Sequence, residues 1–193
     1  MKLVVPPVHS NEDWAVPMDL DDRRFFVLDV SSRYKENTQY FQALDQQMKQ
    51  SGVEALLYDL LHEDLAGFDP RKMPLNDFGF DMKMKAATSV VKFLYEALKE
   101  GKFNIALAAK TGPWESNSCE QVYYCYKEWC KSEGLRQESN AEFGRQLNKL
   151  LPVEKRRRVI EGGREWWYEF PALEECRSAF EKFTKQSNRI WEE

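Results

Sequence analysis

The stretch SNAEFGRQLNKLLPVEKRRRVIEGGREWWYEFP, residues 139–171, decides which fold this sequence predicts. Its first half has a helix-capping residue, Ser139 or Asn140, followed by apolar residues at helical spacing and then a proline. This pattern predicts a helix over residues 141–151. Its second half is a basic segment, a pair of glycines and an aromatic segment. Two glycines permit the tight turn that joins antiparallel strands, so a β-hairpin is predicted directly after the helix.

Residues 81–193 are predicted to form one domain around this stretch. Helices are expected over residues 81–99, 118–132, 141–151 and 172–186, with the hairpin before the last of them. Helix 118–132 starts with Ser118 as its cap and has Gln121 at the capping-box position. This order, with the second and third helices as a helix-turn-helix pair, is typical of a winged helix.

Residues 1–80 are predicted to contain two short strands, two helices and a long loop. The strands are expected over residues 2–5 and 23–30, the helices over 37–50 and 53–61, and the loop over 66–79. The strand over 23–30 is apolar enough to be buried on both faces. Two such strands with a polar loop between them indicate the end of an α/β core. The whole chain is therefore predicted to be α+β and mostly α-helical.

Charge is distributed unevenly along the chain. The net charge is −4, but residues 144–164 hold seven basic and two acidic residues, a local charge of +5 that leaves −9 for the rest. Counterions are released only where phosphates are neutralised, so local cations matter more for DNA binding than the total charge does. The basic stretch therefore predicts a DNA-contact surface.

The predicted DNA contacts come from the helix over 141–151 and from the hairpin. The face of that helix opposite its apolar residues carries side chains that bind base edges or phosphates: Arg145, Gln146, Asn148 and Lys149. The hairpin adds Lys155, Arg156, Arg157, Arg158, Arg164 and Trp166. Successive residues of a strand point to opposite faces, so the four consecutive basic residues cannot all meet one duplex.

The aromatic strand of the hairpin supplies a further expectation. Trp167 is expected to pack inward on the helices, which leaves Trp166 or Tyr168 partly exposed and able to stack on a base or sugar. The alternative interpretation is a solvated basic hairpin on a winged helix that binds protein.

Composition excludes several other classes of protein. No apolar run approaches the roughly 18 residues that a membrane helix needs, and the first residues hold too short an apolar stretch for a secretory signal. A cytoplasmic location is therefore expected. The four cysteines form no CxxC pair and lie far from both histidines, so no metal site is expected. Cys119, Cys125 and Cys130 fall in one predicted helix and are expected to be buried thiols.

Polar residues near the N-terminus form a second candidate site. Asn11 follows a predicted strand, and Arg23 and Arg24 stand just before another. Such residues can sense the γ-phosphate of a nucleotide. Alternatively, Asn11 forms a turn and the two arginines pair with nearby aspartates.

Several segments carry a resemblance to a known family. The runs SNEDWAVPMDLDDRRFFVLDVSSRYKENTQYFQAL and GVEALLYDLLHEDLAGFDPRKMPLND resemble the C-terminal part of phage and plasmid primase-helicases. These proteins belong with the superfamily 3 helicases, a group that includes the poxvirus primase-helicase. The later segments YKEWCKSEG, FGRQLNKLLP and YEFPALEECRSAFE resemble the winged-helix tail of the same proteins. The resemblance covers nearly the whole chain, and DDRRFFVLDV and FDPRKMP are its most specific motifs.

This resemblance implies a domain arrangement, a catalytic role and a set of partners. It implies the truncated end of an AAA+-like ATPase core with its following helices over 1–80, and a winged-helix domain over 81–193. It implies that Asn11 positions the attacking water at the γ-phosphate. Arg23 or Arg24 would be the arginine finger that reaches the ATP of a ring neighbour. The implied partners are DNA and the remainder of a primase-helicase or its ring neighbours. The resemblance also implies a protein of a bacterial host or one encoded by a phage.

The sequence departs from that family in one decisive respect. It contains no GxxxxGK[ST] phosphate-binding loop, and the acidic motif that binds Mg²⁺ is missing too. The chain alone is therefore expected to use no cofactor and to be no enzyme; ATP and Mg²⁺ would belong to a complete parent protein. It is expected to be either a fragment of a larger primase-helicase or a short phage gene product that kept only the tail.

Two functions follow from these expectations. The first is a DNA-replication module that contacts DNA through its winged helix. The second is a protein-interaction or phage regulatory module, in which the winged helix docks on a partner protein and the acidic remainder suits a basic surface. Salt-dependent DNA affinity would favour the first, and a stoichiometric protein partner without DNA affinity would favour the second.

Overall fold

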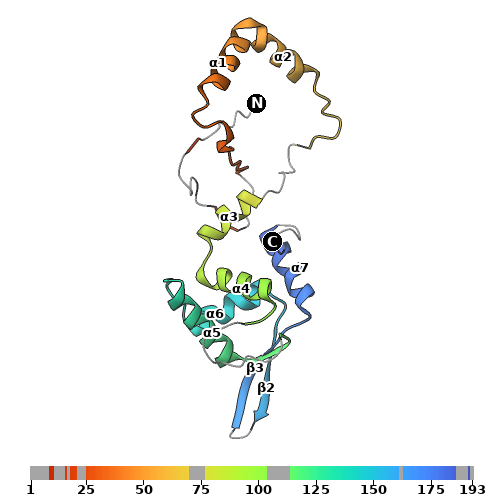
Figure 1. The fold of residues 1–193 in the computed structure, drawn as a ribbon. Coiled ribbons are helices and arrows are strands. Elements are labelled where there is room, and N and C mark those ends of the chain that lie inside the picture. The colour runs from red at the N-terminus through yellow and green to blue at the C-terminus, as the bar shows by residue number, and fades with distance from the viewer. Residues whose placement is uncertain are drawn as a thin grey trace. The chain divides into compact units, whose positions relative to one another are not determined.

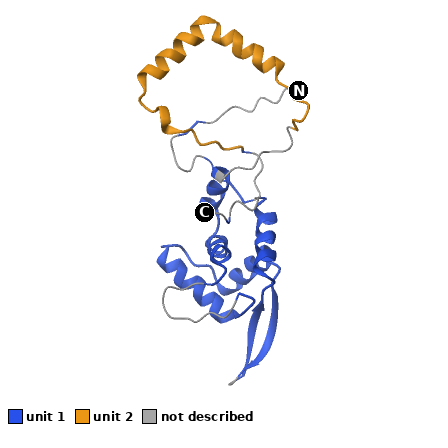
Figure 2. Ribbon diagram, turned by 45° about the vertical axis from the view of Figure 1, so that its right-hand side comes forward, with its two compact units in different colours: residues 1–25, 75–193 blue, residues 26–74 orange. Residues whose placement is uncertain are grey.

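The computed structural model of the chain describes residues 9–10, 16, 18–20, 25–69, 77–103, 114–160, 163–185 and 191. Within these residues the chain is α+β and mostly helical, as predicted, with one small three-stranded sheet. It divides into two compact units, coloured separately in Figure 2. Unit 1 is Met1–Phe25 with Leu75–Glu193, and unit 2 is Phe26–Pro74. The division into residues 1–80 and 81–193 stays a prediction.

Unit 2 consists of two helices joined by a kinked turn. Its elements are a 3-10 turn at Ser32–Tyr34, α1 at Thr38–Gln47, a π-helical turn at Met48–Gly52, and α2 at Val53–His62. The side chain of Asn37 caps α1 by accepting a hydrogen bond from the backbone N–H of Tyr40 at 3.0 Å. The kink includes Ser51, whose φ of 68° is left-handed. None of the described residues of unit 2 is buried, although both helices lie close to the predicted ranges.

The strand predicted over residues 23–30 is wrong for its described part. Residues 25–30 have no regular secondary structure, and Leu28 and Val30 are 65% and 86% exposed. A strand needs a neighbour to complete its backbone hydrogen bonds, and no described strand pairs with this segment. The strand predicted over residues 2–5 lies outside the described residues.

Unit 1 holds the sheet and the other described α-helices, which Figure 1 labels. In chain order they are α3 (Asp77–Ala86), α4 (Ser89–Glu100), β1 (Ser116–Ser118), α5 (Cys119–Ser132), α6 (Asn140–Leu150), β2 (Glu154–Ile160), β3 (Gly163–Glu169) and α7 (Leu173–Thr184). Helices α5, α6 and α7 and the hairpin β2–β3 confirm the sequence prediction closely. Ser118 caps α5 as predicted, because its hydroxyl accepts a hydrogen bond from the N–H of Gln121 at 3.1 Å.

Two predictions for this unit are wrong. The single helix predicted over 81–99 is two helices, because the side chain of Thr88 caps a new helix by accepting from the N–H of Val91. A local capping group thus interrupts a continuous apolar pattern. Helix α3 begins at Asp77, inside the predicted loop, and the short strand β1 was not predicted.

The sheet has the order β1-β3-β2 with antiparallel pairing throughout. In the hairpin, Lys155 lies opposite Tyr168 and Arg157 opposite Trp166. Strand β1 pairs with the base of the hairpin, where Asn117 lies opposite Tyr168. The outer part of the hairpin extends away from the helices (Figure 1), and every residue of β2 is exposed.

The core of unit 1 lies between α4, α5, α6, α7 and β3. At its centre the rings of Phe93, Tyr126 and Phe143 pack together, with centroids 4.8–6.1 Å apart. The hydroxyl of Tyr126 accepts a hydrogen bond from the N–H of Glu138 at 2.8 Å and lies 2.7 Å from the hydroxyl oxygen of Ser89. One buried phenol therefore joins α4, α5 and the turn before α6. The four cysteines are buried, as predicted for the three in α5.

Candidate nucleic-acid interface

Helix α6 is anchored by its cap and by its apolar side. The hydroxyl of Ser139 accepts a hydrogen bond from the N–H of Glu142 at 3.2 Å. Phe143, Leu147 and Leu150 are buried, which turns the predicted DNA-contact residues away from the core. Gly144 permits the close approach of β3, because a Cβ there would lie 3.3 Å from the hydroxyl oxygen of Tyr168.

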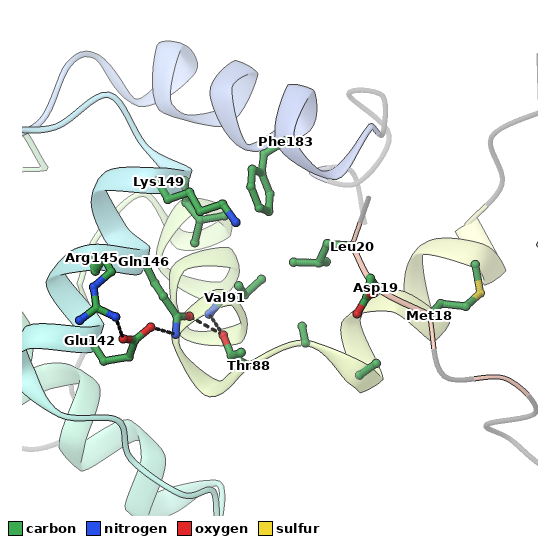
Figure 3. Close-up of a pocket in the computed structure, with 13 residues that line it drawn as sticks. Met18, Asp19, Leu20, Thr88, Val91, Glu142, Arg145, Gln146, Lys149 and Phe183 are labelled. Carbon is green, nitrogen blue, oxygen red and sulfur yellow. Dashed lines mark hydrogen bonds and ion pairs between the residues drawn. The ribbon is translucent and has the colours of Figure 1, made fainter. Parts of the chain in front are cut away.

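The base-reading residues predicted on α6 are engaged within the protein. Glu142 lies between Arg145 and Gln146 and accepts a hydrogen bond from each, as Figure 3 shows. The amide oxygen of Gln146 also accepts from the hydroxyl of Thr88 at 2.7 Å. Asn148 donates to the carbonyl oxygen of Gly144 at 2.8 Å. A base edge would have to replace these bonds, so reading of base sequence by this helix is disfavoured.

A pocket of about 390 Å³ borders this side of α6 (Figure 3). Its walls come from Met18–Leu20, α3, the start of α4, α6 and α7. Lys149 lies at its rim with its ammonium nitrogen 5.4 Å from the ring centre of Phe183. Lys149 is an exposed residue, and its ammonium group suits a phosphate better than a base edge.

One face of the hairpin combines cations with an aromatic ring. We name Lys155, Arg157, Arg164 and Trp166 the open face; the strand alternation and register place them on the same side. The ammonium nitrogen of Lys155 lies 5.4 Å from the ring centre of Trp166, and the guanidinium carbon of Arg157 lies 6.0 Å from it. None of the three cations forms an ion pair within the described residues.

The other face of the hairpin holds its charges in pairs. We name Glu154, Arg156, Arg158 and Glu169 the paired face. Arg156 donates to Glu154 at 2.7 and 3.1 Å, and Arg158 donates to Glu169 at 2.6 and 3.0 Å. Four consecutive cations in the sequence therefore lie on two different faces, and among the described residues those of the paired face are held by carboxylates while those of the open face form no ion pair.

The aromatic strand is oriented differently from the prediction. Tyr168, not Trp167, is the fully buried ring, at 2% exposure, while Trp166 is 49% exposed as expected. Tyr168 packs inward because its face of β3 lies against α6 at Gly144. Trp167 lies on the opposite face, where the guanidinium carbon of Arg158 is 4.8 Å from its ring centre.

A groove of about 790 Å³ lies between α5 and the hairpin. It is lined by Tyr123, Tyr124 and Lys127 of α5 and by Lys155 and Trp166 of the hairpin, among others. Sequence reasoning missed the α5 residues. The available signal was the spacing of Tyr123, Tyr124 and Lys127, which places two rings and a cation on one side of a helix.

The remaining predicted site cannot be placed. Asn11, Arg23 and Arg24 lie outside the described residues. In the part of the chain that the structure describes, no cluster of three or more potential metal ligands occurs. Over the same residues, no helix has both the length and the apolar character of a membrane span.

Comparison with known proteins confirms the class predicted from the resemblance, a primase-helicase-like C-terminal region. A model of the family described as "Poxvirus D5 protein-like" matches residues 85–185, more than half of the chain. The chain therefore belongs to the poxvirus D5 protein-like family, which relates it to DNA replication. The match runs from the end of α3 through α7 and includes the sheet. No curated protein and no solved structure matches the chain.

Proposed function

We propose that this protein is a DNA-replication module that contacts DNA through a winged helix formed by α4, α5, α6 and the three-stranded sheet. The order helix, short strand, helix, helix, hairpin supports this arrangement, with α5 and α6 as the helix-turn-helix pair. The family relationship to primase-helicases supports the replication role.

The observation that carries the proposal is the projecting strand β2, whose residues are all exposed and include four consecutive cations. A basic strand that extends from a helical body can follow a phosphate backbone, and cations there release counterions on binding. Because Gln146 and Asn148 are engaged within the protein, backbone contact by Lys149 and by Lys155–Arg158 is favoured over base reading.

The ATP-site role of Asn11, Arg23 and Arg24 is part of the same proposal, but only within a larger assembly. The sequence contains no phosphate-binding loop, so these residues would act only where another segment or subunit supplies one. The chain by itself is then a DNA-contact module and not an ATPase.

Salt-dependent DNA binding tests the proposal. The variant Arg156→Ala, Arg157→Ala, Arg158→Ala should bind a forked DNA more weakly than wild type. The slope of its log-affinity against log-salt should fall by about 1, because Arg157 lies on the open face whereas Arg156 and Arg158 are held by carboxylates. A matched control removes three cations elsewhere: Lys35→Ala, Lys49→Ala, Lys131→Ala. Equal affinities of wild type and the hairpin variant at low salt would contradict the proposal. Capture of a stoichiometric protein without DNA affinity would favour the protein-docking alternative.

A further inference from the structure

The groove between α5 and the hairpin contains exposed aromatic rings beside cations. A surface that binds only duplex DNA does not need such rings. Trp166 and Tyr124 expose 49% and 45% of their surfaces, from two different elements that line the same groove. Cations accompany both rings: Lys155 lies 5.4 Å from the Trp166 ring centre, and Lys127 lies 5.7 Å from that of Tyr124. Exposed rings with neighbouring cations are the combination that stacks bases and holds the backbone of a single strand.

We infer that this groove binds single-stranded DNA, with bases stacked on Trp166 and Tyr124 and phosphates held by Lys127, Lys155 and Arg157. The inference rests on the proposed function and names the form of DNA that this site takes. The groove volume of about 790 Å³ falls in the range of about 300–1,000 Å³ that is usual for ligand sites.

The charges of the groove favour a single strand over a duplex. Two carboxylates, Glu120 and Glu165, line it together with the lysines. A duplex carries one negative charge per roughly 1.7 Å, so the carboxylates repel it strongly. Its base faces are hidden in the stack, so they cannot stack on the rings. A single strand has a lower charge density and can turn its bases toward the rings.

The charges on the two faces of the hairpin indicate which face binds the single strand. The open face borders the groove, and its cations form no ion pair within the described residues. On the paired face, Arg156 and Arg158 are held by Glu154 and Glu169. A phosphate on that face would compete with a carboxylate already in place, so the single strand is assigned to the open face.

Affinity measurements on matched variants test this assignment. Fluorescence anisotropy would compare a labelled oligo-dT single strand with a duplex of equal length. Trp166→Ala and Tyr124→Ala should each weaken oligo-dT binding about 5- to 150-fold, the usual effect of removing one stacking ring, and leave duplex binding within about two-fold. Lys131→Ala, in α5 but outside the groove lining, is the control and should leave oligo-dT binding within about two-fold.

Quenching of tryptophan fluorescence gives a second measurement. It distinguishes a lost stacking contact from a variant that has lost affinity because it is misfolded. A base stacked on Trp166 should quench its emission, and Trp166→Phe should bind oligo-dT nearly as tightly as wild type while losing that part of the quench. Wild-type affinity and quench in Trp166→Ala, or an equal loss of oligo-dT affinity in Lys131→Ala and Trp166→Ala, would overturn the inference.

The two proposals fail in different ways. If DNA contact through the winged helix is wrong, the triple arginine variant and wild type will show the same salt dependence of binding, for duplex and for single strand alike. If only the single-strand assignment is wrong, duplex binding stays salt-dependent and weakens in the triple variant, while Trp166→Ala and Tyr124→Ala bind oligo-dT as wild type does.

Discussion

Helices α4 and α2 carry comparable numbers of apolar residues and yet lie in opposite environments. Six apolar residues of α4 are 0–5% exposed: Val90, Val91, Phe93, Leu94, Ala97 and Leu98. Those of α2 are 51–73% exposed: Val53, Leu56, Leu57, Tyr58, Leu60 and Leu61. Helix α4 belongs to unit 1, where four helices and a sheet share a core, whereas unit 2 has no buried residue among those described.

The difference shows that two kinds of stabilisation operate in one chain. Unit 2 depends on local interactions, such as the Asn37 cap and the stacked rings of Tyr34 and Tyr40, whose centroids are 4.0 Å apart. Isolated helices of this length are marginal in water. Unit 1 depends on packing, which makes its unfolding cooperative. We therefore expect core substitutions to affect unit 1 strongly and matched substitutions in unit 2 to leave it unchanged.

The largest expected effect comes from removing a central ring of unit 1. Phe143 is fully buried and contacts the rings of Phe93, Tyr123 and Tyr126. Phe143→Ala should lower the free energy of unfolding by about 3–5 kcal/mol, because it removes buried apolar surface and leaves a cavity. Urea denaturation, followed by tryptophan fluorescence, measures this change in the free energy of unfolding. Phe41→Ala in unit 2, where the ring is 51% exposed, is the control and should change this value by less than about 0.5 kcal/mol.

Alkaline pH should destabilise unit 1 through its buried thiols. Burial raises the pKa of Cys125 and of Cys176 from 9.0 to about 11, and that of Tyr126 from 10.0 to about 12. The native state thus holds these protons more tightly than the unfolded chain does. The contribution of the two thiols is complete below pH 9 and is lost as pH rises through about 11, by on the order of 1–2 kcal/mol per thiol; that of Tyr126 is lost at higher pH, through about 12.

Urea midpoints measured between pH 8 and pH 11 check this dependence. Cys125→Ala removes one of the titrating groups, so its midpoint should fall less steeply with pH than that of wild type, whatever its stability at pH 8. Parallel curves for the two proteins would contradict the assignment of the alkaline loss to the Cys125 thiol.

Two glycine variants of unit 1 separate backbone strain from packing. Gly101 ends α4 with a φ of 69°, and a Cβ there would lie 2.9 Å from a methyl carbon of Leu173 in α7. Gly101→Ala should cost about 1–2 kcal/mol for the left-handed backbone, plus the clash. Gly134 has a φ of 65° with nothing within 4 Å, so Gly134→Ala measures the backbone term alone. Stability is measured by thermal or urea unfolding. If Gly101→Ala and Gly134→Ala lose the same free energy of unfolding, α7 shifts to accommodate the added methyl group.

Local signals made much of unit 1 predictable. Ser118 caps α5 as predicted, and Ser139, one of the two predicted candidates, caps α6. The glycine pair placed the hairpin, and the helical spacing around Phe143 identified the buried side of α6. These features depend on residues within one or two turns of each other, so a single sequence contains them. The break at Thr88 was missed because an apolar pattern continues across it.

Features that depend on distant neighbours were not predictable. Strand β1 has three residues and exists through its pairing with β3, about fifty positions later. The strand expected over 23–30 lacks such a partner in the described chain. The groove lined by Tyr124 and Trp166 joins elements about forty residues apart.

The sequence by itself determined that a capped helix and a basic, aromatic hairpin follow each other, because caps, turns and side-chain periodicity act over a few residues. Only the tertiary structure decided which charges of that hairpin are available. The packing of Tyr168 against Gly144 sets the face that turns toward the helices, and Glu154 and Glu169 neutralise the arginines of the other face. Burial and ion pairing depend on which residues the fold brings together, and that is a property of the folded chain as a whole.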